Sequence, residues 1–386
     1  MWRMSLVAAT TGSCSETDCT VIPDPSGPTV TICIPSYNRA DLVSETLDSL
    51  VAQNYPDWEA IVVDDGSTDD SQTVVNAYAA RDPRVRLLSR NRAPKGACTC
   101  RNIAVQHAQG RFLLFLDTDD LLAPFCLEQR VAVLQSDPAL DFAVFPMLIF
   151  SERPEDADRL WNVETGEDDL ERVLRLDPIC QTTGTLWRVD SFRRLGGWHE
   201  ELGIWQDIEL HIRAFAGKLG YVKRFDLRPD VYLRETLGSL SRGDYHSRGK
   251  LESRAAVARL AARSLREGAR SDMISQLRYI CSSVIYEAAT AGHLDIAADL
   301  RKWAEHEGVL TSGERRRLRF AELARASRLD RITPVRTLRD SLMRTFAART
   351  TLGQVRQPRV PDPPHRLREC RDSGDQPSSH EQQSGS

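Results

Sequence analysis

The chain has 386 residues, enough for one large domain with appended segments or for two domains. Its formal net charge of −4 gives no reason to expect nucleic acid as the main partner. Its 9 cysteines lack paired spacing, which favours reduced thiols in a cytosolic protein over a disulfide framework. No apolar stretch approaches the roughly 20 residues of a membrane helix. We therefore expect a cytoplasmic protein, with peripheral contact at the inner membrane face left open.

Composition divides the chain into four segments. Residues 1–27 are rich in Ser, Thr, Asp, Pro and Gly, which predicts a flexible leader. Residues 28–247 alternate strand and helix patterns, whereas residues 248–356 carry the Arg, Ala, Leu and Glu of long helices. Residues 357–386 are rich in Pro, Ser, Gln and Asp, which predicts a disordered tail. The pattern thus predicts an α/β domain followed by a helical region.

Apolar runs and helical periodicity alternate from residue 29 onward. A helix predicted over 97–108 stops at Gly110, a common C-terminal helix signal. One further strand is predicted over 141–150. Repeated strand–helix–strand units imply a mostly parallel sheet with helices on both faces. The strands predicted before residue 117 are 30–34, 58–63, 85–88 and 111–116.

An acidic cluster follows the last of these strands, in the run Asp117-Thr118-Asp119-Asp120. Three neighbouring carboxylates repel one another unless a cation neutralises them. They also stand at the carboxyl end of a strand, where open α/β sheets bind their ligands. Because hard oxygen ligands suit Mg²⁺ or Mn²⁺, a divalent metal on phosphate is the expected occupant.

Six sequence blocks together resemble glycosyltransferase family 2, in the order and with the spacing of that family. The resemblance covers roughly residues 28–242 and implies a GT-A fold, which is Rossmann-like. It also implies inverting transfer of a sugar from a nucleotide-sugar, usually UDP-linked. The blocks are Thr-Ile-Cys-Ile-Pro-Ser-Tyr-Asn-Arg39, Ile-Val-Val-Asp-Asp-Gly-Ser-Thr-Asp69, Arg101-Asn102, Phe-Leu-Asp-Thr-Asp-Asp120, Leu-Gly-Gly-Trp198 and Gln206-Asp207.

The resemblance assigns residues to the nucleotide. Pro35 and Tyr37 match the loop that lies against base and ribose. Asp65 matches the acid that pairs with the base, a role suited to a carboxylate that accepts from a ring N–H. Arg101 matches a position near base and diphosphate, where a fixed cationic fork is useful. For Asp64, a turn-stabilising role beside Gly66 is favoured over ligand contact.

The acidic cluster matches the family's Asp-x-Asp element. Asp117 and Asp119 match its two carboxylates, which hold the ribose, the sugar and the metal. We assign Asp117 to the nucleotide-sugar and Asp119 to the metal. Asp120 extends the cluster, and two interpretations stay open for it: it shares the metal, or it caps the following helix.

Asp207 matches the second residue of the family's Glu-Asp pair and is the predicted catalytic base. An inverting displacement needs one carboxylate to take the proton of the attacking acceptor hydroxyl. Gln206 replaces the usual Glu, which removes a charge beside the base. The alternative for Asp207 is a solvated acid in the first turn of a helix, favoured there by the helix dipole.

Several other side chains carry weaker signals. Trp187, Trp198 and Trp205 either stack on acceptor sugars or pack in the core. Arg234 and the run Ser239-Leu-Ser-Arg242 resemble the loop that closes the family's substrate domain and can reach the diphosphate. His246 is interpreted as a surface residue rather than a metal ligand. The basic helical region is either a solvated face or a surface attracted to anionic lipid or a partner protein.

Together with the acidic cluster, the resemblance implies a metal-dependent inverting glycosyltransferase that uses Mn²⁺ or Mg²⁺ and a UDP-sugar. Its expected acceptor is a glycan or a lipid-linked glycan in polysaccharide biosynthesis. Two other classes stay open. A nucleotidyltransferase also positions metals with carboxylates, but Pro35-Ser-Tyr-Asn38 stands where its Gly-rich phosphate loop would be. A non-catalytic nucleotide-sugar-binding scaffold would leave the function to the helical region.

Overall fold

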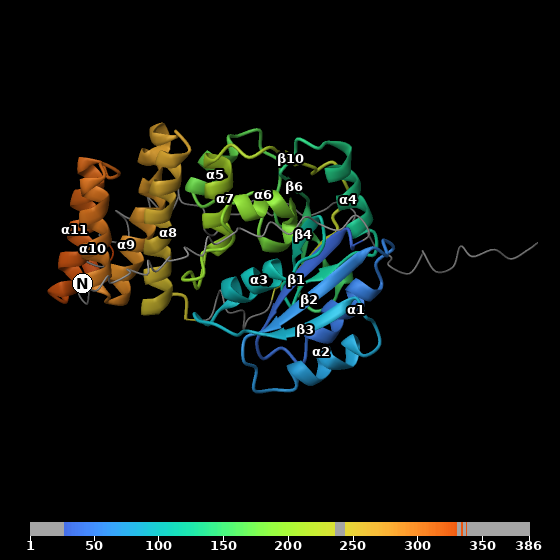
Figure 1. The fold of residues 1–386 in the computed structure, drawn as a ribbon. Helices are drawn as coiled ribbons and strands as arrows, with labels where there is room; N and C mark the ends of the chain where they lie inside the picture. The colour runs from blue at the N-terminus through green and yellow to red at the C-terminus, as the bar shows by residue number, and fades with distance from the viewer. Residues whose placement is uncertain (1–26, 236–243, 330–332, 335–336, 338–386) are drawn as a thin grey trace, which may run out of the picture.

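The computed structural model describes residues 27–235 and 244–329, together with residues 333, 334 and 337 (Figure 1). The predictions for the leader up to residue 26, for the 239–242 loop, for residues 338–356 of the helical region and for the 357–386 tail lie outside the described residues. Within the described residues, no helix is long and apolar enough to cross a membrane.

A mixed sheet of seven strands forms the centre of the α/β part. Its first four strands are parallel, as predicted, because each apolar run is buried between helices on both faces. An antiparallel strand, β9, is inserted between β4 and β6. In spatial order the strands are β10 (Tyr221–Lys223), β6 (Phe142–Val144), β9 (Thr185–Arg188), β4 (Phe112–Phe115), β1 (Val30–Ser36), β2 (Trp58–Asp64) and β3 (Val85–Ser89).

The single strand predicted over 141–150 is wrong, because this segment is two strands in different sheets. After β6, the Phe145 N–H donates to the Gly184 carbonyl at 2.9 Å. Pro146 then has no N–H to continue the ladder, and the chain changes sheet. The second sheet orders β5 (Leu121–Leu122), β11 (Val231–Arg234), β7 (Met147–Phe150) and β8 (Arg159–Leu160), with a 3₁₀ turn at Pro154–Asp156.

Two apolar clusters cover the two faces of the large sheet. One joins the sheet to α1 (Val43–Val51), α2 (Ser71–Ala79) and α4 (Cys126–Ser136). The other joins its opposite face to α3 (Ala97–Gln106), α5 (Asp169–Leu174), α6 (Val189–Arg194) and α7 (Gln206–Ala216). The predicted helices on both faces are therefore confirmed.

The helical region stacks beside the second cluster, at the end of the molecule away from β1–β3 (Figure 1). Its first helix packs against α7, so Ile208 of α7 and Leu251 of the region belong to one continuous apolar core. The core thus crosses the boundary predicted between residues 247 and 248. The helices are α8 (Arg248–Glu267), α9 (Arg278–Ala291), α10 (Leu294–His306) and α11 (Ser312–Ala326), with a 3₁₀ segment at Ser271–Leu277.

Candidate active site

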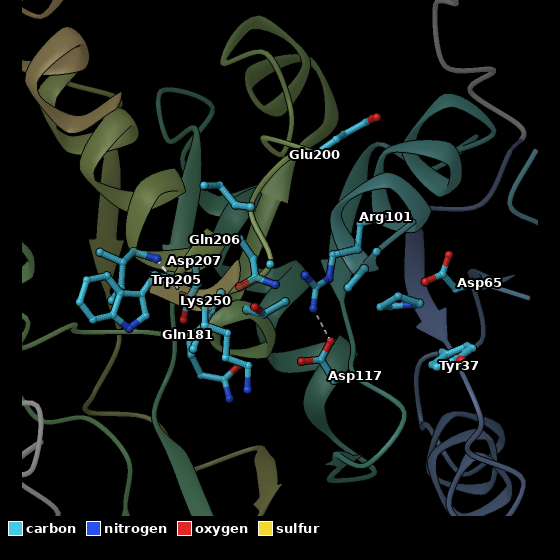
Figure 2. Close-up of a pocket in the computed structure, with 18 of the residues that line it drawn as sticks. Tyr37, Asp65, Arg101, Asp117, Gln181, Glu200, Trp205, Gln206, Asp207 and Lys250 are labelled. Atoms are coloured by element: carbon cyan, nitrogen blue, oxygen red, sulfur yellow. Dashed lines mark hydrogen bonds and ion pairs between the residues drawn. The ribbon is translucent and has the colours of Figure 1, made fainter. Parts of the chain in front are cut away.

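A cavity of about 1020 Å³ opens at the carboxyl ends of β1, β2 and β4 and is closed on another side by α7 and α8. It brings together most of the residues predicted to form a site, although they come from separate parts of the chain. Figure 2 shows Asp207 and Trp205 on one side of Arg101, and Tyr37 and Asp65 on the other. The predicted residues among its lining are Pro35, Tyr37, Asp65, Arg101, Asp117, Asp119 and Asp207.

The end of the cavity near β1 and β2 is built from the loops that follow these strands. Asp65 is buried and accepts a hydrogen bond from the Arg90 guanidinium. The Lys95 ammonium lies 3.5 Å from the centroid of the Tyr37 ring. Asn38 ties the two loops together, because its side-chain oxygen accepts from the Thr68 N–H at 2.8 Å. The result is a fixed wall with one aromatic ring and one carboxylate.

Asp64 is not among the residues that line the cavity. One of its carboxylate oxygens accepts from the backbone N–H groups of Gly66 and Ser67, both at 3.0 Å, and from the Gln72 amide at 2.8 Å. Gly66 has φ of 84°, a conformation that favours glycine. This geometry agrees with the interpretation of Asp64 as a turn-stabilising residue.

Arg101 is a buried cation in the middle of the cavity wall. Its Nη2 donates to Asp117 Oδ1 at 2.5 Å, and its guanidinium lies 4.9 Å from the Trp198 ring centroid. Its Nε and Nη1 have no hydrogen-bond partner among the described residues. Buried guanidinium donors are normally paired. Both nitrogens are buried, so Arg101 acts on the cavity through its charge rather than through exposed donors.

The acidic cluster divides between the cavity and the interior. Burial, together with the nearby Asp117 charge, raises the pKa of Asp119. Asp120 lies behind the wall and does not line the cavity. Its Oδ2 accepts from the Thr183 hydroxyl at 2.9 Å and its Oδ1 from the Arg234 N–H at 3.3 Å. Burial and the charge on Asp119 hold the pKa of Asp120 well above its usual range.

Neither open interpretation of Asp120 gains support from this position. The helix-cap interpretation is wrong, because β5 follows Asp120 and the next helix, α4, begins only at Cys126 with Phe125 as its N-cap. As a metal ligand it is less suited than Asp117 or Asp119, because both of its oxygens already have partners inside the protein.

The donor set fits a metal that shares its ligands with a phosphate. Among the described residues, no group of three or more His, Cys, Asp or Glu could hold an ion by itself. Asp117 and Asp119 do line the cavity together, and Mg²⁺ sites commonly use one or two carboxylates and complete their shell with water and substrate phosphates. A cation bound beside Asp119 would lower the raised pKa of this residue.

Asp207 stands in the first turn of α7, at the cavity wall. Its Oδ1 accepts from the Ile208 N–H at 2.9 Å. Burial raises its pKa, and the positive charge of Arg101 partly offsets this effect. Asp207 is half-buried and lines the cavity beside Gln206, so it is not an exposed first-turn acid. A carboxylate with a raised pKa facing a cavity is suited to take up a proton.

The loop before α7 reaches the cavity and is held at several points. Gly196 and Gly197 have φ of 92° and 71°, and a Cβ on Gly197 would meet the Asn102 side-chain oxygen at 2.9 Å. Asn102 accepts from the Trp198 N–H at 2.9 Å and donates to Glu200 at 2.8 Å. The hydrogen bond from Arg92 holds the pKa of Glu200 below its usual value. Glu200 is therefore a charged residue that links this loop to Asn102 and Arg92.

Some cavity residues were missed from the sequence. Gln181 precedes the 3₁₀ turn at Thr182–Gly184, and Glu200 belongs to the Gly-Gly-Trp-His-Glu run without being assigned a role. Lys250 comes from the helical region and Tyr245 from the segment just before it. Nothing in the sequence assigns a role to these four, because they reach the cavity only through tertiary packing.

The weaker signals resolve as follows. Trp187 and Trp198 pack in the core, where the Trp187 ring stacks on Phe142 with 4.2 Å between the ring centroids. Trp205, in contrast, lines the cavity. Arg234 donates to the Asp119 carbonyl at 3.1 Å and pairs with Glu45 at 2.6 Å. His246 lies 3.5 Å from Glu287, outside the cavity lining.

Comparison with known proteins agrees with this geometry. The family model "Glycosyl transferase family 2" matches residues 31–196. EpsE of Bacillus subtilis, which is named as a glycosyltransferase, is 30% identical over 200 residues, covering 51% of this chain and 70% of EpsE. TuaG of the same organism, named for teichuronic acid biosynthesis, is 34% identical over 132 residues, covering 33% of this chain. That match spans 51% of TuaG, about half of its length.

Among solved structures, residues 1–349 of TarS from S. aureus superimpose with a TM-score of 0.54 at 18% identity. The superposition covers 82% of this chain and 92% of the TarS fragment. At this identity the likeness concerns the fold, which extends into the helical region because the α/β part alone is much shorter than the matched length.

Proposed function

The chain belongs to glycosyltransferase family 2 and has its GT-A-like α/β core, and on that premise we propose that it transfers a sugar from a nucleotide-sugar to an acceptor hydroxyl. One observation carries the proposal. Seven residues predicted from motifs scattered between residues 35 and 207 line a single cavity. A chance resemblance of short motifs would not bring them to one place.

The donor in this proposal is a UDP-sugar. Its base and ribose lie against Pro35, Tyr37 and Asp65, at the end of the cavity built by β1 and β2. A structure of TarS in complex with UDP-GlcNAc, at a TM-score of 0.54, supports a UDP-linked donor. Arg101, a cation in the cavity wall, would then attract the diphosphate through its positive charge.

Asp207 is the catalytic base in the same proposal. It takes the proton of the acceptor hydroxyl while that oxygen attacks the anomeric carbon from the side opposite the diphosphate, which inverts the configuration. The positive charge of Arg101 favours the ionised form of Asp207 and partly offsets the effect of burial.

Asp119, with Asp117, would hold a Mg²⁺ or Mn²⁺ ion. When bound, this ion neutralises negative charge on the departing diphosphate. Asp120 supports the cluster from behind by fixing the backbone of Arg234 and the hydroxyl of Thr183. Asp117 also keeps Arg101 in place through its ion pair.

The acceptor would enter between Asp207, Trp205 and Gln181, where the cavity has polar and aromatic walls. The names of two relatives, TuaG for teichuronic acid biosynthesis and a poly(ribitol-phosphate) β-glucosyltransferase of Bacillus spizizenii, support a cell-surface polymer or its lipid-linked precursor as acceptor. Action in the cytoplasm, with or without contact to the inner membrane face, is part of this proposal.

A donor panel tests the proposal. The protein is heated with UDP-, GDP- and dTDP-sugars in the presence of Mn²⁺, and a true donor raises the melting temperature by mass action. The stabilising nucleotide-sugar is then incubated with the protein, and a transferase should slowly release UDP. Release of pyrophosphate from a nucleoside triphosphate would instead indicate a nucleotidyltransferase. Binding without any release, even with acceptor glycans, would indicate a scaffold.

A further inference from the structure

One serine of the helical region fixes the turn that leads into α7. The Ser253 hydroxyl accepts from the Gly203 N–H at 3.1 Å and from the Ile204 N–H at 3.2 Å, and donates to the Ile204 carbonyl at 3.0 Å. A hydroxyl has one donor and two acceptor positions, so all of its capacity is used on this turn. Ser253 is 6% exposed, which keeps water from competing.

The next residue of the same helix braces Trp205. Arg254 is fully buried and is paired with Glu287 of α9 at 2.5 Å. Its guanidinium lies 5.3 Å from the Trp205 ring centroid and 4.1 Å from that of Tyr245. Both rings line the cavity, so Arg254 supports them from the side away from the ligand space.

The residues that Ser253 and Arg254 contact stand directly before Asp207, the predicted catalytic base. Trp205 is the N-cap of α7 and has φ of 61°, a left-handed conformation that non-glycine residues adopt only when their surroundings hold them there. Asp207 follows two residues later. The contacts from Ser253 and Arg254 therefore determine where α7 begins and where the Asp207 carboxylate lies.

From this geometry we propose that Ser253 and Arg254 are positioning residues for Asp207, so that the helical region is part of the active site. The inference rests on the proposed function, because it takes Asp207 as the base. The donor end of the cavity is built on β1 and β2 and is independent of α8. We call the three hydrogen bonds of the Ser253 hydroxyl to Gly203 and Ile204 the clamp. Its loss should therefore slow the chemical step and leave nucleotide binding intact.

The test compares two serines of α8. Ser253→Ala removes the clamp. Ser264→Ala removes the hydroxyl of a residue that is 8% exposed, and among the described residues this hydroxyl bonds the Leu260 carbonyl of its own helix, at 3.1 Å. Misplacing a reacting group by about 1 Å can lower the rate by roughly a hundredfold, so we expect kcat of Ser253→Ala to fall roughly tenfold to a hundredfold. The UDP dissociation constant should not change. Ser264→Ala should change neither, and Ser253→Thr, which keeps the hydroxyl, should recover most of kcat.

A second measurement separates this inference from the proposed function. Amide hydrogen exchange over residues 200–208 should be faster in Ser253→Ala than in the wild type and in Ser264→Ala. If exchange is the same in all three, the clamp does not exist, whether or not the protein has transferase activity. If the wild type transfers sugar and kcat of Ser253→Ala equals that of Ser264→Ala, the positioning role is wrong although the proposed function stands.

Discussion

The two ends of the cavity are built in different ways. At the end near β1 and β2, the proposed nucleotide end, Tyr37 and Asp65 follow directly after these strands, so the sheet itself fixes them. At the opposite end, Asp207 depends on a loop that is held by Asn102 of α3, Arg213 of α7 and Ser253 of α8. The first end is rigid by construction, and the second depends on contacts between distant parts of the chain. Binding and catalysis should therefore be separable by substitution.

Asp207→Asn should separate them most strongly. The amide keeps the shape and can still accept from the Ile208 N–H, but it cannot take a proton. General bases of this kind contribute roughly 10²–10⁴-fold to rate, and kcat should fall by that amount. UDP affinity, measured by calorimetric titration, should stay at the wild-type value. A collapse of UDP binding would show that Asp207 belongs to the nucleotide end instead.

Asp119→Ala should affect the point where the two ends meet. Its carboxylate is a proposed metal ligand, and its loss should remove the metal-dependent part of UDP binding. We expect a loss of roughly tenfold to a hundredfold in the presence of Mn²⁺, as for one interaction with a charged group. Affinity measured with a chelator should equal that of the wild type under the same conditions. An unchanged titration with Mn²⁺ would refute the assignment, and Asp207→Asn serves as the control that retains Mn²⁺ dependence.

Asp65→Asn should weaken UDP binding and leave kcat unchanged, the opposite of the effect expected for Asp207→Asn. The amide oxygen can still accept a hydrogen bond from Arg90, but the proposed hydrogen bond to the nucleotide base loses the carboxylate charge. Because charge-assisted hydrogen bonds are roughly twice as strong as neutral ones, UDP affinity should fall by about fivefold to tenfold. The value of kcat at saturating donor should not change. A fall in kcat with unchanged affinity would contradict the division of the cavity into two ends.

Gln206→Glu should have the smallest effect, on pH dependence. Burial already raises the pKa of Asp207, so kcat should rise with pH through that raised pKa and level off above it. A second carboxylate beside Asp207 disfavours its ionised form and should move this acid limb to higher pH by roughly one unit. Profiles of kcat against pH for both proteins check the shift. A limb that stays at the same pH would mean that a charge at residue 206 does not act on the base.

The position of the residues at the proposed nucleotide end was predictable from the sequence because they sit beside buried strands. The predicted strands 58–63 and 85–88 agree with β2 (Trp58–Asp64) and β3 (Val85–Ser89) within one residue at each end. Apolar runs of this kind have one stable environment, the interior of a sheet. The polar residues that end them are then at the edge where ligands bind.

The other end could not be predicted to the same extent. Lys250 and Ser253 lie in a helical region whose sequence shows only amphipathic periodicity, and Tyr245 lies in the segment just before it. Their place in or beside the cavity follows from the packing of α8 on α7, which no local pattern encodes. The antiparallel β9 and the break at Pro146 were missed for the same reason, since both depend on pairing with distant segments.

A crystal structure of the protein with UDP and Mn²⁺ tests the central claim most directly. The account predicts the uracil between Tyr37 and Asp65, the diphosphate beside Asp119 and Arg101, and the Asp207 carboxylate free of nucleotide contacts across the remaining space. A uracil bound against Trp205 and Tyr245, or a nucleotide outside this cavity, would contradict it.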